Sequence, residues 1–304
     1  MTIASRRSIS ALILVLVSLA SPSPTVARAQ DAASARQGQV IVAVVGRDDA
    51  PIATLTEQDF VVREDNVARE VVKVTACVAP SHIVLLVDDS QASTDAIPFL
   101  RDGLKNFITT VTAHTPAPQI RITTFGDRPT LRQDFTSVPA PLTRQSERIF
   151  AQAGAGARML EAISETCRDL KTRRISGAAV VAVVNEAGPE FSEESHTRIE
   201  EELRGAGAAL WTVVLHDARG GAQNIEGRER AMVIGDVTRD TGGMNKNVLS
   251  PQTLAPALGS VAAVLVSQYE ITYGRPDRLI PATRLTVETR DRSATVLVRR
   301  WAAP

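Results

Sequence analysis

The fold is decided by one stretch of sequence, Ile83-Val84-Leu85-Leu86-Val87-Asp88-Asp89-Ser90-Gln91-Ala92-Ser93. Its five consecutive apolar residues are typical of a strand that is buried on both faces, as in a parallel sheet. Acids and hydroxyls follow directly, and a helical pattern starts at Ile97. Because ligands of open α/β sheets bind at the carboxyl ends of the strands, the residues after Val87 mark a candidate site.

The same alternation of strand and helix extends over residues 79–268. Further buried strands are predicted from apolar runs at Ile120–Phe125, Ala179–Val184 and Leu210–Leu215. Helices are predicted from three-to-four spacing of apolar residues, at Ile97, Leu100, Leu104, Phe107 and Val111, at Met159, Ile163, Cys167 and Leu170, and at Leu254, Ala257, Leu258, Val261 and Leu265. This order indicates an α/β domain with a doubly wound, mostly parallel sheet.

Strand patterns of period two flank this domain on both sides. Residues 38–76 contain short apolar segments separated by turn residues, and residues 269–304 begin with the alternation of Tyr269, Ile271 and Tyr273. We hypothesise that the two segments pair into one small β-domain into which the α/β domain is inserted. Two separate β flaps are the alternative arrangement.

The amino terminus has the three parts of a signal peptide. Arg6 and Arg7 precede an apolar run of about ten residues, and Ala27-Arg28-Ala29 forms a small-x-small cleavage signature. The run is too short to cross roughly 30 Å of hydrocarbon. We therefore expect residues 1–29 to be removed, residues 30–37 to form a linker, and the mature chain to be periplasmic or extracellular without a membrane span.

Composition excludes several classes of function. Hydrophobic residues make up 44% of the 304 residues, and 34 basic residues balance 34 acidic ones. Loss of Arg6, Arg7 and Arg28 with the signal peptide leaves 31 basic against 34 acidic residues, so the mature chain is mildly acidic. This globular composition gives no electrostatic reason to expect binding of nucleic acid or of an anionic membrane.

The two cysteines predict a disulfide. With only two cysteines and with four histidines that are widely separated in sequence, the chain lacks the ligand spacing of a structural zinc site. Cys77 lies just before the first core strand, and Cys167 lies about ten residues, roughly 15 Å, into a helix that descends from the opposite edge of the sheet. These heights agree, and an exported protein meets an oxidising compartment, so we expect a Cys77–Cys167 disulfide. The alternative is a pair of free thiols, with Cys167 on the apolar face of its helix.

Several segments together resemble a known family. They are Leu55–Asp65, Val84–Ser90, Ile122–Asp127, Asp240–Gly243 and Ser267–Tyr273. Their order and spacing from about residue 38 onward resemble von Willebrand factor type A (VWA) domains, in particular a bacterial secreted group with β segments on both sides. The resemblance implies a binding site, the metal-ion-dependent adhesion site, in which oxygen ligands from three loops hold magnesium or a similar cation.

The resemblance also assigns the ligand positions of that site. They fall at Asp88, Ser90 and Ala92 in the first loop, Ala157 in the second, and Asn185, followed by Glu186, in the third. Only Asp88 and Ser90 keep the oxygen type, although Ser93 lies one residue beyond Ala92. We therefore expect a degenerate site and no resident cofactor, with weak binding of Mg²⁺ or a similar divalent cation left open.

A physical substitute for the metal is predicted at Arg158. Its guanidinium, one residue after Ala157, could reach Asp88 or Asp89 and neutralise charge that a cation would otherwise offset. The alternative is that Arg158 points into solvent.

We expect a non-enzymatic module that binds an unidentified protein through the upper rim of the sheet, in adhesion or scaffolding. The rim residues are Asp88 to Ser93, Gly126-Asp127, Ala157-Arg158, Asn185-Glu186 and His216. One alternative is an envelope structural protein in which the β-domain is the working part and the VWA-like domain a spacer. A remoter one is a serine-hydrolase-like enzyme that pairs His216 with Ser90 or Ser93, but the sequence has no Gly-x-Ser-x-Gly elbow. A response-regulator receiver would need a phosphoacceptor Asp and a Lys at later strands, which this sequence lacks.

Overall fold

The computed structural model describes residues 37–216, 224–275 and 282–299. These residues belong to a unit of the chain that begins at Gln37. The predicted signal peptide, the linker up to residue 36 and the last five residues of the sequence lie outside the described residues.

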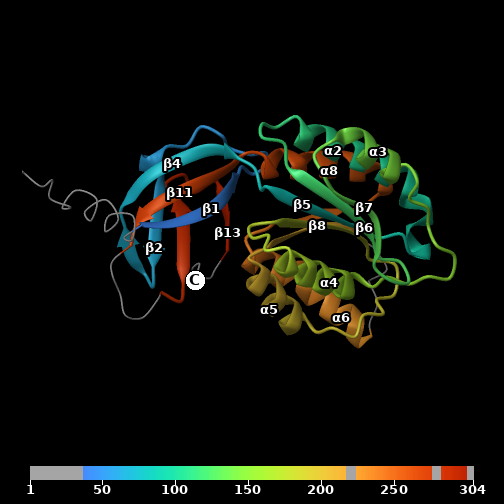
Figure 1. Cartoon of the computed structure of the whole chain (residues 1–304). Coiled ribbons are helices and arrows are strands. Elements are labelled where there is room, and N and C mark those ends of the chain that lie inside the picture. Colours follow the sequence, from blue (N-terminus) through green and yellow to red (C-terminus); the bar gives the residue numbers. More distant parts are fainter. Residues whose placement is uncertain (1–36, 217–223, 276–281, 300–304) are drawn as a thin grey trace, which may run out of the picture. The chain divides into compact units, whose positions relative to one another are not determined.

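A six-stranded sheet of order β10-β9-β8-β5-β6-β7 forms the centre of the α/β domain (Figure 1). Its strands are β5 (His82–Val87), β6 (Gln119–Thr124), β7 (Thr130–Thr136), β8 (Ala179–Asn185), β9 (Ala209–Leu215) and β10 (Asn245–Val248). Neighbouring strands are parallel except β6 and β7, which pair antiparallel. The predicted fold class, a doubly wound and mostly parallel sheet, is confirmed.

Helices cover both faces of this sheet. One face carries α2 (Ile97–Thr112), α3 (Pro139–Ser146) and α8 (Leu254–Leu265), and the other carries α4 (Met159–Thr172), α5 (His196–Ala206) and α6 (Ile225–Met232). A π-helical turn (Val233–Val237) and α7 (Thr238–Asp240) follow α6, and short 3-10 helices occupy Glu57–Asp59, Gln91–Ala96 and Pro251–Thr253. Within the described ranges, none of the helices combines the length and the apolar character needed to cross a membrane.

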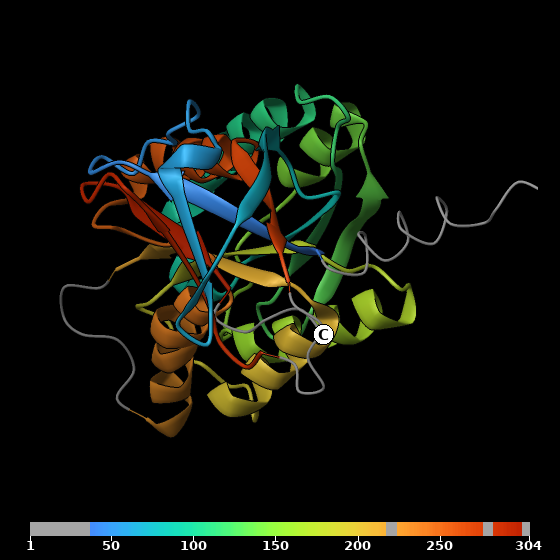
Figure 2. The ribbon, with the colours of Figure 1, turned by 90° about the vertical axis from the view of Figure 1, so that its left-hand side faces the viewer.

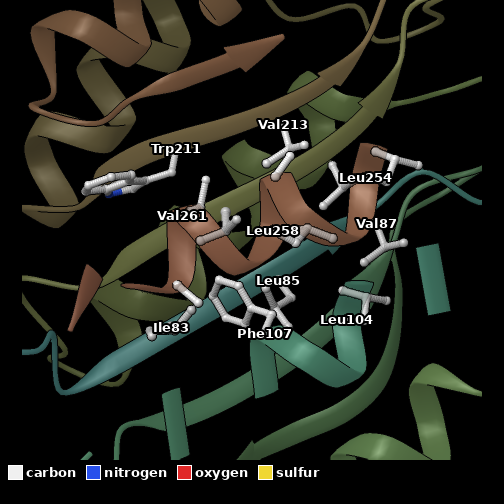
Figure 3. Close-up of a cluster of buried hydrophobic side chains, with 14 of the residues drawn as sticks. Ile83, Leu85, Val87, Leu104, Phe107, Trp211, Val213, Leu254, Leu258 and Val261 are labelled. Atoms are coloured by element: carbon white, nitrogen blue, oxygen red, sulfur yellow. The ribbon is translucent and has the colours of Figure 1, made fainter. Parts of the chain in front are cut away.

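Successive side chains of each buried strand point to opposite faces of the sheet, so the core has two layers. Ile83, Leu85 and Val87 pack toward α2 and α8, whereas Val84 and Leu86 pack toward α4 and α5. Figure 3 shows the first of these layers, in which side chains of α2 and α8 meet those of β5 and β9. Burial on both faces explains why these strands are continuous apolar runs in the sequence.

Strands from both ends of the described chain build the β-domain. They are β1 (Gln37–Val45), β2 (Phe60–Glu64), β3 (Val67–Arg69), β4 (Val71–Val78), β11 (Gln268–Gly274), β12 (Leu285–Thr289) and β13 (Thr295–Val298). They form sheets of order β13-β1-β11-β4 and β12-β2-β3. Strand β1 pairs antiparallel with both β11 and β13, and β2 pairs antiparallel with β12. Figures 1 and 2 show the blue strand β1 beside the carboxy-terminal strands drawn in orange and red, and its neighbours in the sheet are β11 and β13.

The predicted disulfide is wrong, because both cysteines are free thiols. Cys167 is fully buried in α4, in the core layer between α4, α5 and the sheet. Cys77 is exposed in β4, and its carbonyl oxygen lies 2.9 Å from Nε2 of His114, which follows α2. Since α2 and α4 cover opposite faces of the sheet, Cys77, beside the end of α2, and Cys167 in α4 lie on different sides of it.

Candidate functional site

The candidate site lies at the carboxyl end of β5, where the strand order reverses. Strand β5 has β6 on one side and β8 on the other, so the loops that leave these strands diverge around Asp88. Such a switch point is where open α/β sheets bind their ligands. The structure brings Asp88, Ala157 and Asn185 to this edge, each less than a tenth exposed.

Asp88 uses both carboxylate oxygens on backbone amides. Its Oδ1 accepts a hydrogen bond from the amide of Ser90 at 2.9 Å, and its Oδ2 accepts one from the amide of Asn185 at 3.0 Å. Burial raises the pKa of Asp88, and these hydrogen bonds and the charge of Arg230 oppose that rise. The carboxylate therefore ties β5 to β8.

Asp89 points to the other side of β5. Its Oδ1 accepts a hydrogen bond from the amide of Gly126 at 2.6 Å, and its Oδ2 lies 3.2 Å from Nη2 of Arg132 and 2.9 Å from Nε2 of Gln152. The cation beside Asp89 thus comes from β7. The buried Asp89 carboxylate thus joins the segments that contain Gly126, Arg132 and Gln152.

The prediction that Arg158 reaches Asp88 or Asp89 is wrong. Its Nη1 lies 3.1 Å from Oε2 of Glu161 and 3.2 Å from the carbonyl oxygen of Phe191. Arg158 is the residue before α4, and Glu161 lies on the first turn of that helix. This local ion pair holds the guanidinium away from the end of β5.

At the remaining ligand positions, the Asn185 side chain bonds to neighbouring backbone, and the two alanines offer no side-chain oxygen. The side-chain Nδ2 of Asn185 donates to the carbonyl oxygen of Ala92 at 2.8 Å, and its Oδ1 accepts a hydrogen bond from the backbone amide of Ala187 at 3.1 Å. Ala92 and Ala157 present only methyl groups where the resemblance places hydroxyls. Ser90 and Ser93 are buried beside them.

Residues 186–192, which we name the closing loop, cover this site. A Cβ added to Gly188 would lie 2.9 Å from Cβ of Ala92 and 3.5 Å from Oγ of Ser90, so the loop backbone rests directly on the first ligand loop. The amide of Ala157 donates to the carbonyl of Pro189 at 2.9 Å, and the amide of Phe191 donates to the carbonyl of Ala157 at 2.8 Å. Backbone from the closing loop therefore joins the first and second ligand loops.

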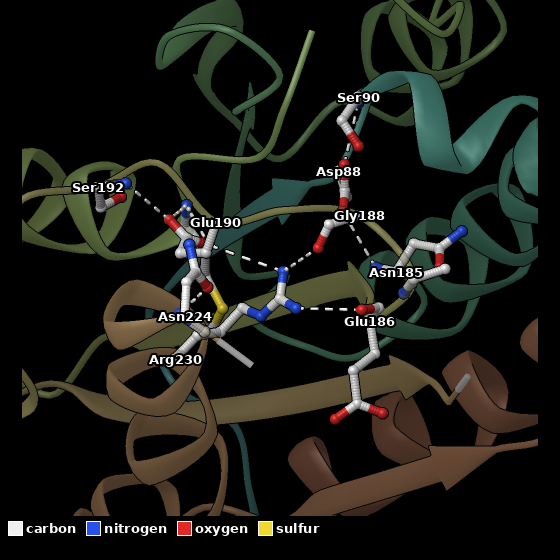
Figure 4. Close-up of polar contacts among 12 residues, drawn as sticks. Asp88, Ser90, Asn185, Glu186, Gly188, Glu190, Ser192, Asn224 and Arg230 are labelled. Atoms are coloured by element: carbon white, nitrogen blue, oxygen red, sulfur yellow. Dashed lines mark hydrogen bonds and ion pairs between the residues drawn. The ribbon is translucent and has the colours of Figure 1, made fainter. Parts of the chain in front are cut away.

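Arg230 on α6 holds the closing loop in place (Figure 4). It is 1% exposed, and its guanidinium donates to the carbonyl oxygens of Gly188 and Glu186, both at 3.1 Å. The carboxylate of Glu190 lies 3.9 Å away. Sequence reasoning missed Arg230, because its helix is mostly polar, with no pattern that sets this arginine apart, and its partners lie 40 or more residues earlier.

Glu190 links the closing loop to the start of α4. Its side chain is fully buried, and its Oε1 accepts hydrogen bonds from the amides of Met159 at 3.0 Å and Ser192 at 3.2 Å. Burial raises the pKa of Glu190 to about 7, against the opposing effects of Ser192 and Arg230. The side chain of Arg158 does not cap α4, so the first backbone amides of the helix need other acceptors. The Glu190 carboxylate accepts from the amide of Met159, and Oγ of Ser192 accepts from the amide of Glu161.

Comparison with solved structures finds distant similarity to proteins with VWA domains. The VWA domain of SpRpn10 is 14% identical, with a TM-score of 0.47, and the match covers 62% of this chain and 98% of that domain. The α/β domain itself has the doubly wound, mostly parallel sheet described above.

Two further structures show similarity at the same level. A von Willebrand factor type A protein from Catenulispora acidiphila is 14% identical, with a TM-score of 0.47, over 88% of this chain and 75% of its own. BatB from Bacteroides thetaiotaomicron is 12% identical, with a TM-score of 0.44, over 60% of this chain and 98% of its own. No protein-family model matches the sequence, and no curated protein matches it.

The outer surface of the VWA-like rim carries two exposed aromatic side chains. Phe191 of the closing loop is 50% exposed, and its ring lies against Gly156. Phe150 is 63% exposed, with the guanidinium of Arg101 stacked 4.2 Å from its ring centre. His216, at the end of β9, forms an ion pair with Glu186 when protonated. Sequence reasoning placed His216 and Glu186 on this rim but missed both aromatic residues.

Proposed function

We propose that the chain is an exported protein-binding module, of the adhesion or scaffolding type, whose VWA-like rim recognises its partner without a resident metal ion. The observation that carries this proposal is the closing loop. Its backbone rests on Ala92 and Ser90 and is held there by Arg230.

The residues at the ligand positions do not fit a magnesium site. Mg²⁺ requires near-octahedral oxygen coordination and favours anionic ligands. Here both oxygens of Asp88 accept backbone amides, the Asn185 side chain is bonded to neighbouring backbone, and Ala92 and Ala157 offer no oxygen from their side chains. In the described part of the chain, no three His, Cys, Asp or Glu side chains gather in a way that could hold a metal ion. We therefore propose that the partner contacts side chains of the rim directly and is not held through a bound metal ion.

The two exposed aromatic residues provide the contact surface. Phe and other aromatic side chains are enriched at the centres of protein interfaces, where they bury a large area at little entropic cost. Phe150 and Phe191 lie on the two loops that also contact Asp89 and Ala157, so the core of the site supports their positions. We propose that a partner protein buries both rings.

Export and the absence of catalysis are parts of the same proposal. Arg6, Arg7 and the cleavage signature at Ala27-Arg28-Ala29 support export. Ser90 and Ser93 are 0% and 2% exposed, so neither hydroxyl is offered to a substrate as a nucleophile. Their burial supports a binding role for the rim.

A capture experiment with matched variants tests the proposal. The exported chain is cross-linked in its native envelope as wild type, as the rim variant F150A/F191A, and as the control V67A/V72A, which removes exposed apolar groups from the β-domain. We expect the rim variant to lose the captured partner, the control to keep it, and a chelator to change neither result. Loss of the partner in the control alone would show that the β-domain is the working part and would overturn the proposal.

A further inference from the structure

A groove of about 470 Å³ lies beside the exposed side of α4. Two segments of the chain line it, namely the first turns of α4 with the residue before them, and the loop that follows the closing loop. All six lining side chains are charged: Arg158, Glu161, Glu165, Arg168, Glu193 and Glu194. Pockets for small molecules are mostly apolar, so this lining favours a charged occupant.

The groove adjoins the exposed ring of Phe191. Nη1 of Arg158, in the lining of the groove, donates to the carbonyl oxygen of Phe191 at 3.2 Å, and Oγ of Ser192 accepts from the amide of Glu161 at 3.0 Å. Phe191 is 50% exposed. A partner segment that covers this ring therefore continues directly into the groove.

The groove carries an excess of negative charge. It has four glutamates and two arginines, and each arginine is already paired with one glutamate. The pairs are Arg158 with Glu161 and Arg168 with Glu194, each with 3.1 Å between the nitrogen and the oxygen. Glu165 and Glu193 are exposed, and neither has an ion-pair partner in the part of the chain that the structure describes. Two carboxylates are therefore left to pair with an incoming group.

This excess charge selects a cationic occupant. An acidic segment would be repelled, and an apolar one would cover the carboxylates of Glu165 and Glu193 without pairing them. A metal ion is not favoured, because the described His, Cys, Asp and Glu side chains form no group of three that could hold one. Guanidinium or ammonium groups of a partner would instead form charge-assisted hydrogen bonds with both carboxylates.

The length of the groove sets the size of that segment. From Arg158 to Arg168 the chain advances roughly 15 Å, at about 1.5 Å per helical residue. An extended peptide covers this distance with about five residues.

We propose that the partner docks through an extended basic segment of about five residues, which starts with an apolar side chain on Phe191 and places cationic side chains beside Glu165 and Glu193. The inference rests on the proposed function, because Phe191 belongs to the rim surface, and it adds the chemical class of the partner. Because the two carboxylates are exposed, each ion pair contributes modestly and weakens with salt.

Titration of the ¹⁵N-labelled chain with a synthetic peptide tests the proposal. The probe is acetyl-Leu-Arg-Gly-Arg-Gly-amide, and the control peptides replace both arginines by the neutral isostere citrulline or the leucine by glycine. At low ionic strength, we expect the probe to shift the amide signals of Glu193 and Glu194 saturably, with a dissociation constant of about 1 mM. The citrulline peptide is expected to bind at least about fivefold more weakly, and about 0.5 M salt should remove this difference. Replacement of the leucine should weaken binding to the wild type but not to F191A.

Matched variants separate the groove from a general attraction to an acidic chain. E165Q/E193Q is expected to weaken binding of the probe by about fivefold or more. D102N/E201Q, which removes two exposed carboxylates outside the groove, should leave the affinity unchanged. Absence of a saturable shift, equal binding of the citrulline peptide, or equal effects of the two variants would each overturn the proposal.

Capture of the native partner by cross-linking distinguishes this proposal from the proposed function. We expect E165Q/E193Q to retain less of the partner than the wild type, and D102N/E201Q to retain as much. If F150A/F191A loses the partner while E165Q/E193Q keeps it in full, the rim binds its partner but the basic segment is wrong. If neither variant loses the partner, both proposals fail.

Discussion

Arg230 donates a hydrogen bond of 3.1 Å to the carbonyl oxygen of Gly188, a residue 42 positions earlier in the chain. Gly188 rests on Ala92 and Ser90 at the first ligand loop. One buried side chain of α6 therefore determines how the closing loop covers the end of β5. Without that guanidinium, two buried carbonyl oxygens and the carboxylate of Glu190 would lose their cation.

Replacement of Arg230 by Met is expected to reduce the free energy of unfolding by about 3–5 kcal/mol, since it leaves buried acceptors and a carboxylate uncompensated. Denaturant unfolding measures this change. R228M, on the exposed side of the same helix, is the matched control and is expected to change stability by less than about 0.5 kcal/mol. Equal stabilities of the two variants would contradict the role given to Arg230.

Glu190 is expected to make stability depend on pH. Its pKa is about 7 in the folded chain against an ordinary value of 4.5, so between these values the folded state binds more protons than the unfolded state. The contribution of Glu190 is therefore fully present below pH 4.5 and is lost as the pH rises through 7, by roughly 3 kcal/mol at most.

The E190Q variant isolates that contribution. The difference in unfolding free energy between wild type and E190Q is expected to change across this pH range, with the wild type losing stability relative to the variant as the pH rises. E193Q, which alters an exposed carboxylate of the neighbouring loop, should follow the wild type. Parallel curves for wild type and E190Q would show that Glu190 titrates normally.

Gly126 lies so close to Asp89 that it cannot carry a side chain. A Cβ there would lie 2.7 Å from Oδ1 of Asp89 and 2.8 Å from the amide of Ser90. We expect G126A to cost about 1–3 kcal/mol in unfolding free energy through overpacking. G235A is the control, because nothing lies within 4 Å of a Cβ at that position, and it is expected to be neutral or slightly stabilising. An unchanged unfolding free energy in G126A would contradict the close packing of Gly126 against Asp89.

The two thiols are expected to differ sharply in reactivity. Cys77 is exposed, whereas burial raises the pKa of Cys167 to about 12 and keeps it from forming a thiolate. A thiol reagent is expected to label one cysteine in the native chain and two after unfolding, and C77S should abolish the native reaction. An intact mass lower by two hydrogens, with neither thiol labelled, would restore the disulfide interpretation.

The parts of the fold that follow from buried periodicity were predictable from the sequence. Strands β5, β6, β8 and β9 are apolar runs, and α2, α4 and α8 keep their apolar spacing, because burial alone dictates these patterns. The antiparallel edge strand β7 and the short helices α3 and α6 were not predicted. They are mostly polar, so their sequences carry no comparable period.

The candidate site shows where sequence reasoning fails. The position of Asp88 follows from the end of β5, but the contacts of Arg230 and Glu190 depend on how distant loops meet, which no local pattern encodes. Arg158 was chosen for its proximity in sequence, yet Arg132 and Arg230 were the relevant cations. The disulfide failed for a related reason, because helical rise gives the height of Cys167 but not the face of the sheet.

Titration of the chain with Mg²⁺, Mn²⁺ and Ca²⁺ by isothermal calorimetry tests whether the rim works without a metal ion. The closing loop over the site and the missing ligand oxygens at Ala92 and Ala157 predict no saturable binding in the micromolar range for any of the three. A dissociation constant near micromolar for any of these ions, lost in D88N, would show that the rim holds a metal ion and would exclude metal-free recognition.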